Sequence, residues 1–468
     1  MYRNQLITLD KWLKKPNRKP IILRGARQVG KSTLGRMFAE QQNLSLAEIN
    51  LEKYPELGPT FKRNDPVALV NVLEALPGIG SLSTGTVHAS DNSNSSLLFL
   101  DEIQAVPEAI PALRYLYEEM GQLAVMAAGS LLEFALSEHK FPMPVGRVEY
   151  LHMGPMTFTE FLDALDETKL SSVIKSFRAG DEINPVIHDR LLDLLRHYFF
   201  VGGMPEAVNV YATTRRLKDV SEVHNSIIET YREDFPKYIG ARNLARIQNV
   251  FNFTARNIGQ KVKYSQYSHQ DKSATIKTDI ELLCMARVIT KVVHSHCSGL
   301  PLQADMVEKI YKLLFLDVGL MNAICGLGWN SISQMTTTQL CNEGSIAEQF
   351  IGQHLQDILS SSPNRDLTYW LREGRSTNAE VDYVIALDGN IIPIEVKSGA
   401  TGSLKSVHQF VGEKNVPLAI RFDTGLPSIQ TITTRVRTME KSTDINYQLL
   451  SLPLYLVEQL TAVIHEVS

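Results

Sequence analysis

The sequence has few of the features that mark secreted or membrane proteins. It contains four cysteines among 468 residues, and no two of them form a C-x-x-C pair, which indicates reduced, mostly structural thiols. No segment approaches the roughly 18 consecutive apolar residues of a membrane span. Residues 1–15 are polar and amphipathic and lack the apolar core of a signal peptide. We therefore expect a cytoplasmic protein without a membrane partner.

An excess of positive charge is also absent. Lysine and arginine together number 47, against 51 aspartates and glutamates, and the net charge is −4. This balance argues against a protein that coats nucleic acid through bulk charge, but it is compatible with a local basic groove. The hydrophobic fraction of 44% and the charged fraction of 21% are typical of soluble globular proteins. The length predicts two to four domains.

The N-terminal third alternates short apolar segments with helical patterns. This alternation is typical of an α/β fold in which helices cover a parallel sheet. Residues 77–96 are rich in Gly, Ser and Asn and predict a solvated loop between the second and third strands. The strands are expected within residues 20–25, 45–51, 96–104, 123–130 and 148–153.

The rest of the chain predicts helices first and strands later. Residues 157–239 have helical patterns, which "GGMP" at 202–205 interrupts. Further helices follow, and the segments 286–296 and 309–319 could then pair as a hairpin. Helices followed by a hairpin would suit a winged-helix module, whose outward helix would span about 274–285. After a linker, a helix and three strands predict a last domain from about Gly344.

The segment GARQVGKST fits the phosphate-binding pattern G-x-x-x-x-G-K-[ST] between an apolar strand and a helix. Glycines let backbone N–H groups turn toward phosphate oxygens, and the helix N-terminus adds its dipole. Lys31 is expected to reach the β- and γ-phosphates of ATP, and Ser32 to offer a hydroxyl to Mg²⁺. The alternative is a chance match on a glycine-containing turn. The residues expected to bind the nucleotide are Gly25, Ala26, Arg27, Gln28, Val29, Gly30, Lys31, Ser32, Thr33 and Asp101.

Polar residues at strand ends complete this predicted site. Asp101 ends the apolar run LLFLD, where a carboxylate is otherwise costly, so we expect it to hold Mg²⁺ while Glu102 polarises the attacking water. A surface charge is the alternative for Glu102. Ser130 could help to place the water or could be a simple turn residue. Arg147 precedes the fifth strand and is the best candidate for an arginine finger or a γ-phosphate sensor, although a surface salt bridge is an equally simple interpretation.

The segment EVDYVIALDGNIIPIEVKSG predicts a hairpin with Asp388-Gly389 as its turn. Glu395 and Lys397 are two residues apart and share one face of the second strand. Pairing would bring Asp382 close to them. Two acids that bind Mg²⁺ or Mn²⁺ and a lysine that acts on water are the core of the PD-(D/E)xK nuclease pattern.

Three interpretations of these charges stay open. Asp382 and Glu395 could hold a metal ion, with Lys397 as a catalytic group. Glu348, on the helix that opens this domain, matches the extra acid of many such nucleases. Alternatively, Glu395 and Lys397 could be a structural pair on an edge strand. Finally, the fold could be nuclease-like but inactive, and could serve to bind DNA or a protein partner.

Taken in order, several segments resemble one family along nearly the whole chain. These segments are GARQVGKST, LFLDEIQ, AAGS, GRVEYLHMGPMTFTEFL, YFFVGGMPEAV, KIYKLLFLDVGLMNAI and EVDYVIALDGNIIPIEVKSG. They are similar to prokaryotic AAA-type ATPases with a C-terminal domain of unknown function, relatives of the archaeal ATPase group and, more distantly, of the STAND NTPases. The resemblance implies an ATPase core at 1–155, a helical lid at 156–240, a winged-helix-like region at 241–330 and a PD-(D/E)xK nuclease-like domain at 344–468.

Two functions of different classes follow. The first is a Mg²⁺-dependent ATPase coupled to a nuclease-like domain that acts on or binds DNA. The second is a regulatory NTPase switch whose nuclease-like domain is inactive and binds a protein partner or DNA. Arg147 and the family resemblance also predict a homo-oligomer, in which this arginine completes a neighbour's site. A helicase ranks last, because the rest of the chain contains no pattern of a second RecA-like core.

Overall fold

A computed structural model describes residues 1–82, 95–130, 132, 134, 144–239, 244–329, 344–360, 366–372, 379–397, 404–437 and 442–467. The chain divides into two compact units. The first unit is Tyr2–Gly154 with Met285–Arg287, and the second unit is Pro155–Cys284 with Val288–Ser468. The expected solvated loop at 77–96 lies largely outside the described residues. Within the described part of the chain, no helix is both long enough and apolar enough to cross a membrane.

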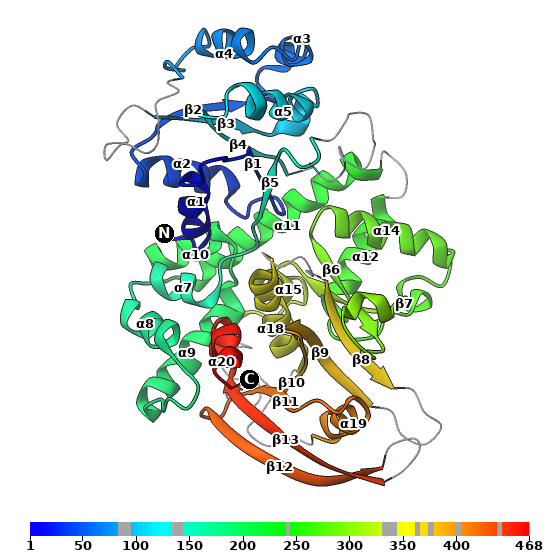
Figure 1. The fold of residues 1–468 in the computed structure, drawn as a ribbon. Coiled ribbons are helices and arrows are strands. Elements are labelled where there is room, and N and C mark those ends of the chain that lie inside the picture. The colour runs from blue at the N-terminus through cyan, green and yellow to red at the C-terminus, as the bar shows by residue number, and fades with distance from the viewer. Residues whose placement is uncertain are drawn as a thin grey trace. The chain divides into compact units, whose positions relative to one another are not determined.

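The first unit contains a five-stranded sheet in the order β2-β3-β4-β1-β5, with every pair parallel (Figure 1). The third and fourth strands are buried along their whole length, as expected for strands that are covered on both faces. The α/β fold with a parallel sheet core is thereby confirmed. The strands are β1 (Ile21–Arg24), β2 (Ser45–Asn50), β3 (Ser96–Asp101), β4 (Ala124–Ala128) and β5 (Glu149–His152).

Helices cover both faces of this sheet. On one face, Leu98 and Leu100 of β3 join a core with apolar side chains of α3, α4 and α5. On the other face, Gly35 of α2 lies directly against the ring of Phe99, so a larger side chain would push the helix off the sheet. The helices of this unit are α1 (Gln5–Leu13), α2 (Lys31–Gln41), α3 (Gly58–Lys62), α4 (Pro66–Glu74) and α5 (Ala109–Glu119).

The second unit begins with helices. The first of them, α7 (Phe158–Ala164), starts at a capping box formed by Thr157 and Glu160. Among the described residues, five helices precede the expected winged-helix region at 241–330, and three more open it. They are α7, α8 (Thr168–Ser176), α9 (Pro185–Val201), α10 (Pro205–Thr214), α11 (Leu217–Ile239), α12 (Leu244–Arg256), α13 (Tyr264–Tyr267) and α14 (Ser273–Met285).

Within the described residues, the strands of the second unit form one sheet of eight, in the order β12-β13-β11-β10-β9-β8-β6-β7. Helices α15 (Val318–Ile324), α18 (Gly344–Leu359), α19 (Lys405–Lys414) and α20 (Leu460–Val467) accompany them. The strands are β6 (Ile289–Ser295), β7 (Met306–Phe315), β8 (Leu367–Arg372), β9 (Ala379–Leu387), β10 (Asn390–Val396), β11 (Leu418–Asp423), β12 (Ser428–Arg437) and β13 (Ser442–Pro453).

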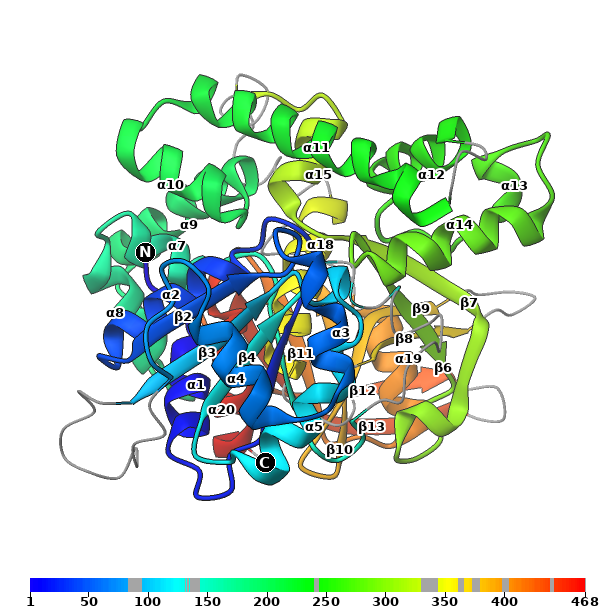
Figure 2. The same ribbon diagram turned by 90° about the horizontal axis from the view of Figure 1, so that it is seen from above.

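The expected hairpin of the winged-helix region is present, but it does not stand alone. Strands β6 and β7 pair antiparallel directly after α14, as predicted. However, β6 also pairs in parallel with β8, with Val292 opposite Leu367 (Figure 2). The winged-helix-like region at 241–330 and the nuclease-like region at 344–468 therefore share one sheet, and the boundary expected between them crosses it.

Glycines allow a close backbone crossing between the "GGMP" and "DVG" segments. Gly202 has φ 71°, and a Cβ at this position would overlap with the carboxylate of Asp317. That buried carboxylate accepts hydrogen bonds from the backbone N–H groups of Gly203 at 2.6 Å and Leu320 at 3.0 Å. A Cβ on Gly319 would in turn meet the backbone N of Gly202 at 2.6 Å. The two segments therefore depend on each other's glycines.

Candidate functional site

The phosphate-binding segment joins the end of β1 to the start of α2. A Cβ at Gly25 would overlap with the carbonyl oxygen of Met153, so only glycine fits there. Gly30 has φ 92° and forms the N-cap of α2, a conformation that glycine adopts without strain. Ala26 and Val29 are buried, whereas Thr33 is exposed on the first turn of the helix. The loop therefore has the conformation that the sequence pattern predicts.

Lys31 is the first residue of α2, and its ammonium lies inside this loop. It is 8% exposed, and Nζ donates to the carbonyl oxygens of Gly25 at 3.0 Å and Ala26 at 2.7 Å. Burial lowers the pKa of Lys31 to about 8, although Glu102 and Asp101 act in the opposite direction. The amine is therefore held where a phosphate would meet it, with two carboxylates nearby.

Ser32 and Asp101, the two predicted Mg²⁺ ligands, are in direct contact. Ser32 Oγ donates to Asp101 Oδ2 at 2.6 Å, and the backbone N–H of Glu102 donates to Asp101 Oδ1 at 3.0 Å. Burial raises the pKa of Asp101, and the Ser32 hydroxyl partly offsets this effect. A hydroxyl and a carboxylate are oxygen ligands of the kind that Mg²⁺ prefers. The pair therefore fits the metal that accompanies ATP.

Glu102 follows β3 in the left-handed conformation, with φ 49°. Its Oε2 accepts from Gln104 Nε2 at 2.6 Å and from both N and Oγ of Ser130 at 3.3 Å. The structure thus brings Ser130, a candidate for placing the water, into contact with Glu102. It adds Gln104, which sequence reasoning missed. A Cβ on Gly129 would overlap with the Gln104 amide, so this side chain has a tightly fitted place.

Arg147 lies apart from these residues. The P-loop, Asp101 and Ser130 follow the carboxyl ends of strands, whereas Arg147 lies before the amino end of β5. Its Nε donates to Glu118 Oε1 at 2.8 Å, and its side chain is 44% exposed. Arg147 therefore lies too far from the P-loop to sense the γ-phosphate bound to its own chain. The surface ion pair is present, and a role in a neighbour's site stays a prediction.

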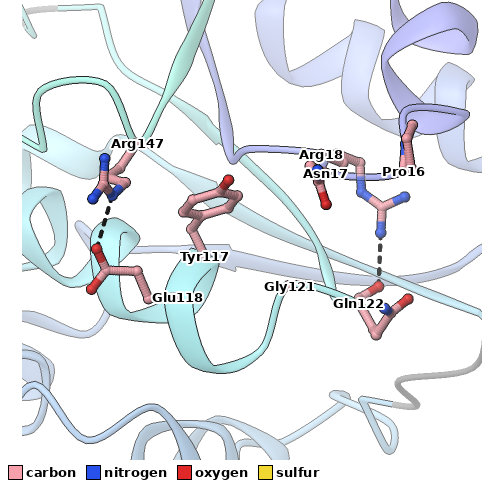
Figure 3. A pocket seen from close by; sticks show the side chains of 8 residues that line it. All are labelled: Pro16, Asn17, Arg18, Tyr117, Glu118, Gly121, Gln122 and Arg147. Carbon is pink, nitrogen blue, oxygen red and sulfur yellow. Dashed lines mark hydrogen bonds and ion pairs between the residues drawn. The ribbon is translucent and has the colours of Figure 1, made fainter.

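Arg147 also lines a pocket of about 550 Å³ in the first unit. Figure 3 shows it between the end of α5 and the segment before β1, with Arg147 bonded to Glu118 on one side and Arg18 bonded to the Gln122 carbonyl on the other. The Arg18–Gln122 hydrogen bond measures 2.7 Å. This pocket lies at the amino ends of the strands, whereas the P-loop follows the carboxyl end of β1. The pocket is therefore not the predicted ATP site.

In the second unit, the predicted hairpin brings its charges together. Asp388 and Gly389 both have positive φ, 50° and 78°, as a tight two-residue turn requires. The resulting register places Ile394 opposite Tyr383, so that Asp382 and Glu395 are cross-strand neighbours. Asp382 Oδ2 accepts from the backbone N–H of Val396 at 2.8 Å, and Lys397 forms an ion pair with Glu395.

A lysine that sequence reasoning missed lies among these carboxylates. Lys312 of β7 is 1% exposed. Its Nζ is 2.9 Å from Glu348 Oε1 and 3.9 Å from Asp382 Oδ1, and it also forms an ion pair with Glu380. The signal was present in the sequence, because Lys312 opens the apolar run KLLFL just as Glu395 interrupts another apolar strand. We call Glu348, Glu380, Asp382 and Glu395 the acid cluster.

Burial dominates the electrostatics of the acid cluster. Burial raises the pKa of Glu348 to about 7, against the effect of Lys312, and raises that of Glu395 to about 8, with Asp382 adding to the shift. Burial also acts to lower the pKa of Lys312, but Glu348, Asp382 and Glu380 outweigh it and raise the pKa. Lys312 is therefore charged, and the carboxyl groups of Glu348 and Glu395 hold protons more readily than usual.

The acid cluster does not have the arrangement of a metal site. Across the described ranges of the chain, no group of three or more His, Cys, Asp or Glu side chains is positioned to hold a metal ion. The predicted ligands Glu348, Asp382 and Glu395 are close together, but Lys312 lies against two of them. The arrangement of these residues therefore differs from the divalent-metal site that the sequence predicts.

Comparisons with known proteins agree with the P-loop geometry. Residues 17–162 match the family model of an AAA domain, residues 192–331 match a domain of unknown function (DUF8612), and residues 343–452 match another (DUF4143). No curated protein matches the sequence. With the AAA match and the loop geometry, the first unit is an AAA-type P-loop ATPase domain.

Two solved structures match this chain at low identity and low TM-score. A Walker-type ATPase of Pyrococcus abyssi is 14% identical, and the match covers 69% of this chain and 95% of that one, with a TM-score of 0.40. The ORC2 protein of Aeropyrum pernix, in ADPNP and ADP complexes, is 12% identical over 70% of this chain and 92% of its own, with a TM-score of 0.35.

Proposed function

We propose that the first unit hydrolyses ATP with Mg²⁺ and that its nucleotide state controls how the second unit engages DNA. One observation supports this proposal above the others. The Ser32–Asp101 contact, the Lys31 ammonium and the Glu102 carboxylate converge on one P-loop. These are the groups that ATP hydrolysis requires, and they come from two separate segments, the start of α2 and the end of β3.

Binding of the triphosphate would use the loop and the start of α2. Backbone N–H groups of residues 25–31 and the helix dipole attract phosphate oxygens, and Lys31 neutralises charge on the β- and γ-phosphates. Ser32 and Asp101 would hold Mg²⁺, which supplies charge neutralisation and orientation when it is bound.

Hydrolysis would use Glu102 as the general base. A water molecule attacks the γ-phosphorus, Glu102 takes a proton from that water, and the bond from the γ-phosphorus to the oxygen of the ADP leaving group breaks. Gln104 and Ser130 hold the Glu102 carboxylate by hydrogen bonds and so fix its direction. They act as positioning residues for this step.

The test is the substitution Glu102→Gln. An amide of nearly the same shape cannot accept the proton, so turnover should fall about 10²–10⁴-fold, while binding of a fluorescent ATP analogue persists. Glu119→Gln is the matched control, because Glu119 is an exposed glutamate at the end of α5. Full turnover by Glu102→Gln would exclude Glu102 as the base.

Self-association is the second part of this proposal. Arg147 is exposed at the far edge of the sheet, where it could reach the ATP of another copy, and such a finger can be worth roughly 10³–10⁵ in rate. Light scattering with and without ATP measures the association. A monomer under both conditions, together with full activity of Arg147→Ala, would contradict it.

For the second unit, the position of Lys312 favours the regulatory switch over DNA cleavage. The acids and Lys397 of the nuclease pattern are present, but Lys312 lies against two of the acids, Glu348 and Asp382. We therefore propose that this unit binds DNA without cutting it. Fluorescence anisotropy with labelled DNA measures binding, and plasmid nicking with Mg²⁺ or Mn²⁺ measures cleavage. Nicking that Lys397→Ala abolishes would reverse this assignment.

A further inference from the structure

We propose that Lys312 is the built-in cation of the acid cluster, so that this cluster needs no divalent metal ion. The inference rests on the nuclease-like part of the proposed function and deepens it, because it explains why such a site would not cleave DNA. It identifies the cluster's counter-ion as a side chain of the second unit itself.

The contacts of Lys312 come from two different elements. Glu348 belongs to α18, whereas Glu380 and Asp382 belong to β9. The ammonium thus lies where carboxylates from a helix and a strand converge, and two of these carboxylates, Glu348 and Asp382, are acids that the sequence pattern assigns to a metal ion. A lysine that is 1% exposed has no path by which its head group could leave for solvent without local opening of the fold.

The remaining oxygens of the acid cluster leave little for a metal ion. Asp382 uses Oδ2 to accept from the Val396 N–H and turns Oδ1 toward Lys312. Glu395 is in an ion pair with Lys397 through Oε1. Its Oε2 is buried and has no hydrogen-bond partner among the described residues, and it is the atom through which an ion could still bind.

The Lys312 ammonium also occupies space that a metal ion would need. A divalent cation bound between Glu348 and Asp382 would have to displace this buried ammonium from both carboxylates. Separating a buried charge from its partners is costly, so the displacement would weaken metal binding.

The experiment is a thermal melt of the full chain with and without Mn²⁺. Wild type should melt at the same temperature in both cases. Lys312→Met should melt lower, by roughly 5–10 °C, because it leaves buried carboxylates without their partner. Mn²⁺ should then raise its melting temperature again, because the metal takes over the charge that the lysine supplied. Lys309→Met is the matched control, since Lys309 is an exposed lysine on the same strand.

Two further variants keep the test decisive. If Lys312→Met does not fold, the double variant Lys312→Met/Glu348→Gln removes one negative charge together with the lysine and should fold without metal. A wild-type melting temperature that rises with Mn²⁺, and does not rise in Asp382→Ala, would overturn the proposal. ATP turnover of the same proteins reports on the first unit separately, so a failure of the ATPase assignment would be recognised as such.

Discussion

At the scale of single residues, Lys31 makes ATP binding depend on pH. Burial lowers its pKa to about 8, so the amine loses its charge as the pH rises through 8. Because phosphate binding favours the charged form, affinity for ATP should be constant below about pH 7 and should fall above pH 8, by up to about tenfold per pH unit.

The measurement is a titration with a fluorescent ATP analogue between pH 7 and 9.5. Lys31→Arg is the comparison, since a guanidinium stays charged throughout this range. Its affinity should be weaker overall but flat with pH. Parallel pH profiles for the two proteins would show that another group causes the loss.

The sequence was sufficient to predict those site residues whose spacing along the chain determines their geometry. Lys31 and Ser32 belong to one local pattern, and the carboxylates at 101 and 102 end a strand that the pattern requires. Gln104 and Lys312 were missed because their partners are defined only by folding. Gln104 and Ser130 both donate to the carboxylate of Glu102, and Lys312 is paired with Glu348, 36 residues away.

At the scale of elements, the crossing of the "GGMP" and "DVG" segments predicts a large effect of one methyl group. Gly202→Ala should destabilise the second unit in two ways. The backbone conformation of Gly202, φ 71° and ψ −167°, costs other residues about 1–3 kcal/mol. The clash with Asp317 adds about 1–3 kcal/mol of overpacking.

Gly180→Ala separates these two contributions. Gly180 also has positive φ, 88°, but a Cβ there would meet no atom within 4 Å. Its substitution should cost the strain of a positive φ, without a steric clash. Both variants are measured by chemical denaturation, and equal losses of unfolding free energy would mean that the contact with Asp317 is unimportant.

Local patterns also explain which elements could be predicted. The β6–β7 and β9–β10 hairpins follow from apolar segments that are close in sequence. The parallel pairing of β6 with β8 joins residues about 75 positions apart, such as Val292 and Leu367, and no local signal specifies its register. For this reason the sequence suggested a separate winged helix where the structure has one continuous sheet.

At the scale of the whole molecule, buried titratable groups determine how stability changes with pH. Burial raises the pKa of Glu348 and Glu458 to about 7 and that of Glu395 to about 8. The folded state therefore binds more protons than the unfolded state up to about pH 8, so these groups make stability fall as pH rises. Burial lowers the pKa of His224 and His354 to about 4, which has the opposite effect, but only below about pH 6.5.

Below pH 6.5 the carboxyl groups and the histidines change stability in opposite directions. Above pH 6.5 only the carboxyl groups still change it. We expect the free energy of unfolding of the second unit to fall between pH 6.5 and 8, by up to about 1.4 kcal/mol per pH unit for each group. The melting temperature should fall with it. Calorimetry at several pH values measures this slope. Glu458→Gln should flatten it, because an amide does not titrate, and a melting temperature that rises over this range would contradict the prediction.

The Glu458 carboxylate also has a consequence for how the protein is made. It accepts from the Thr159 N–H at 2.8 Å and from the Thr159 hydroxyl at 2.6 Å, across 299 residues of sequence. A ribosome that adds about 5–20 residues per second needs about 15–60 s to synthesise that interval. Throughout this time the start of α7 has been translated, but its carboxylate partner does not yet exist. The second unit therefore cannot complete its fold until late in translation. A chaperone that binds the nascent chain would act during this interval.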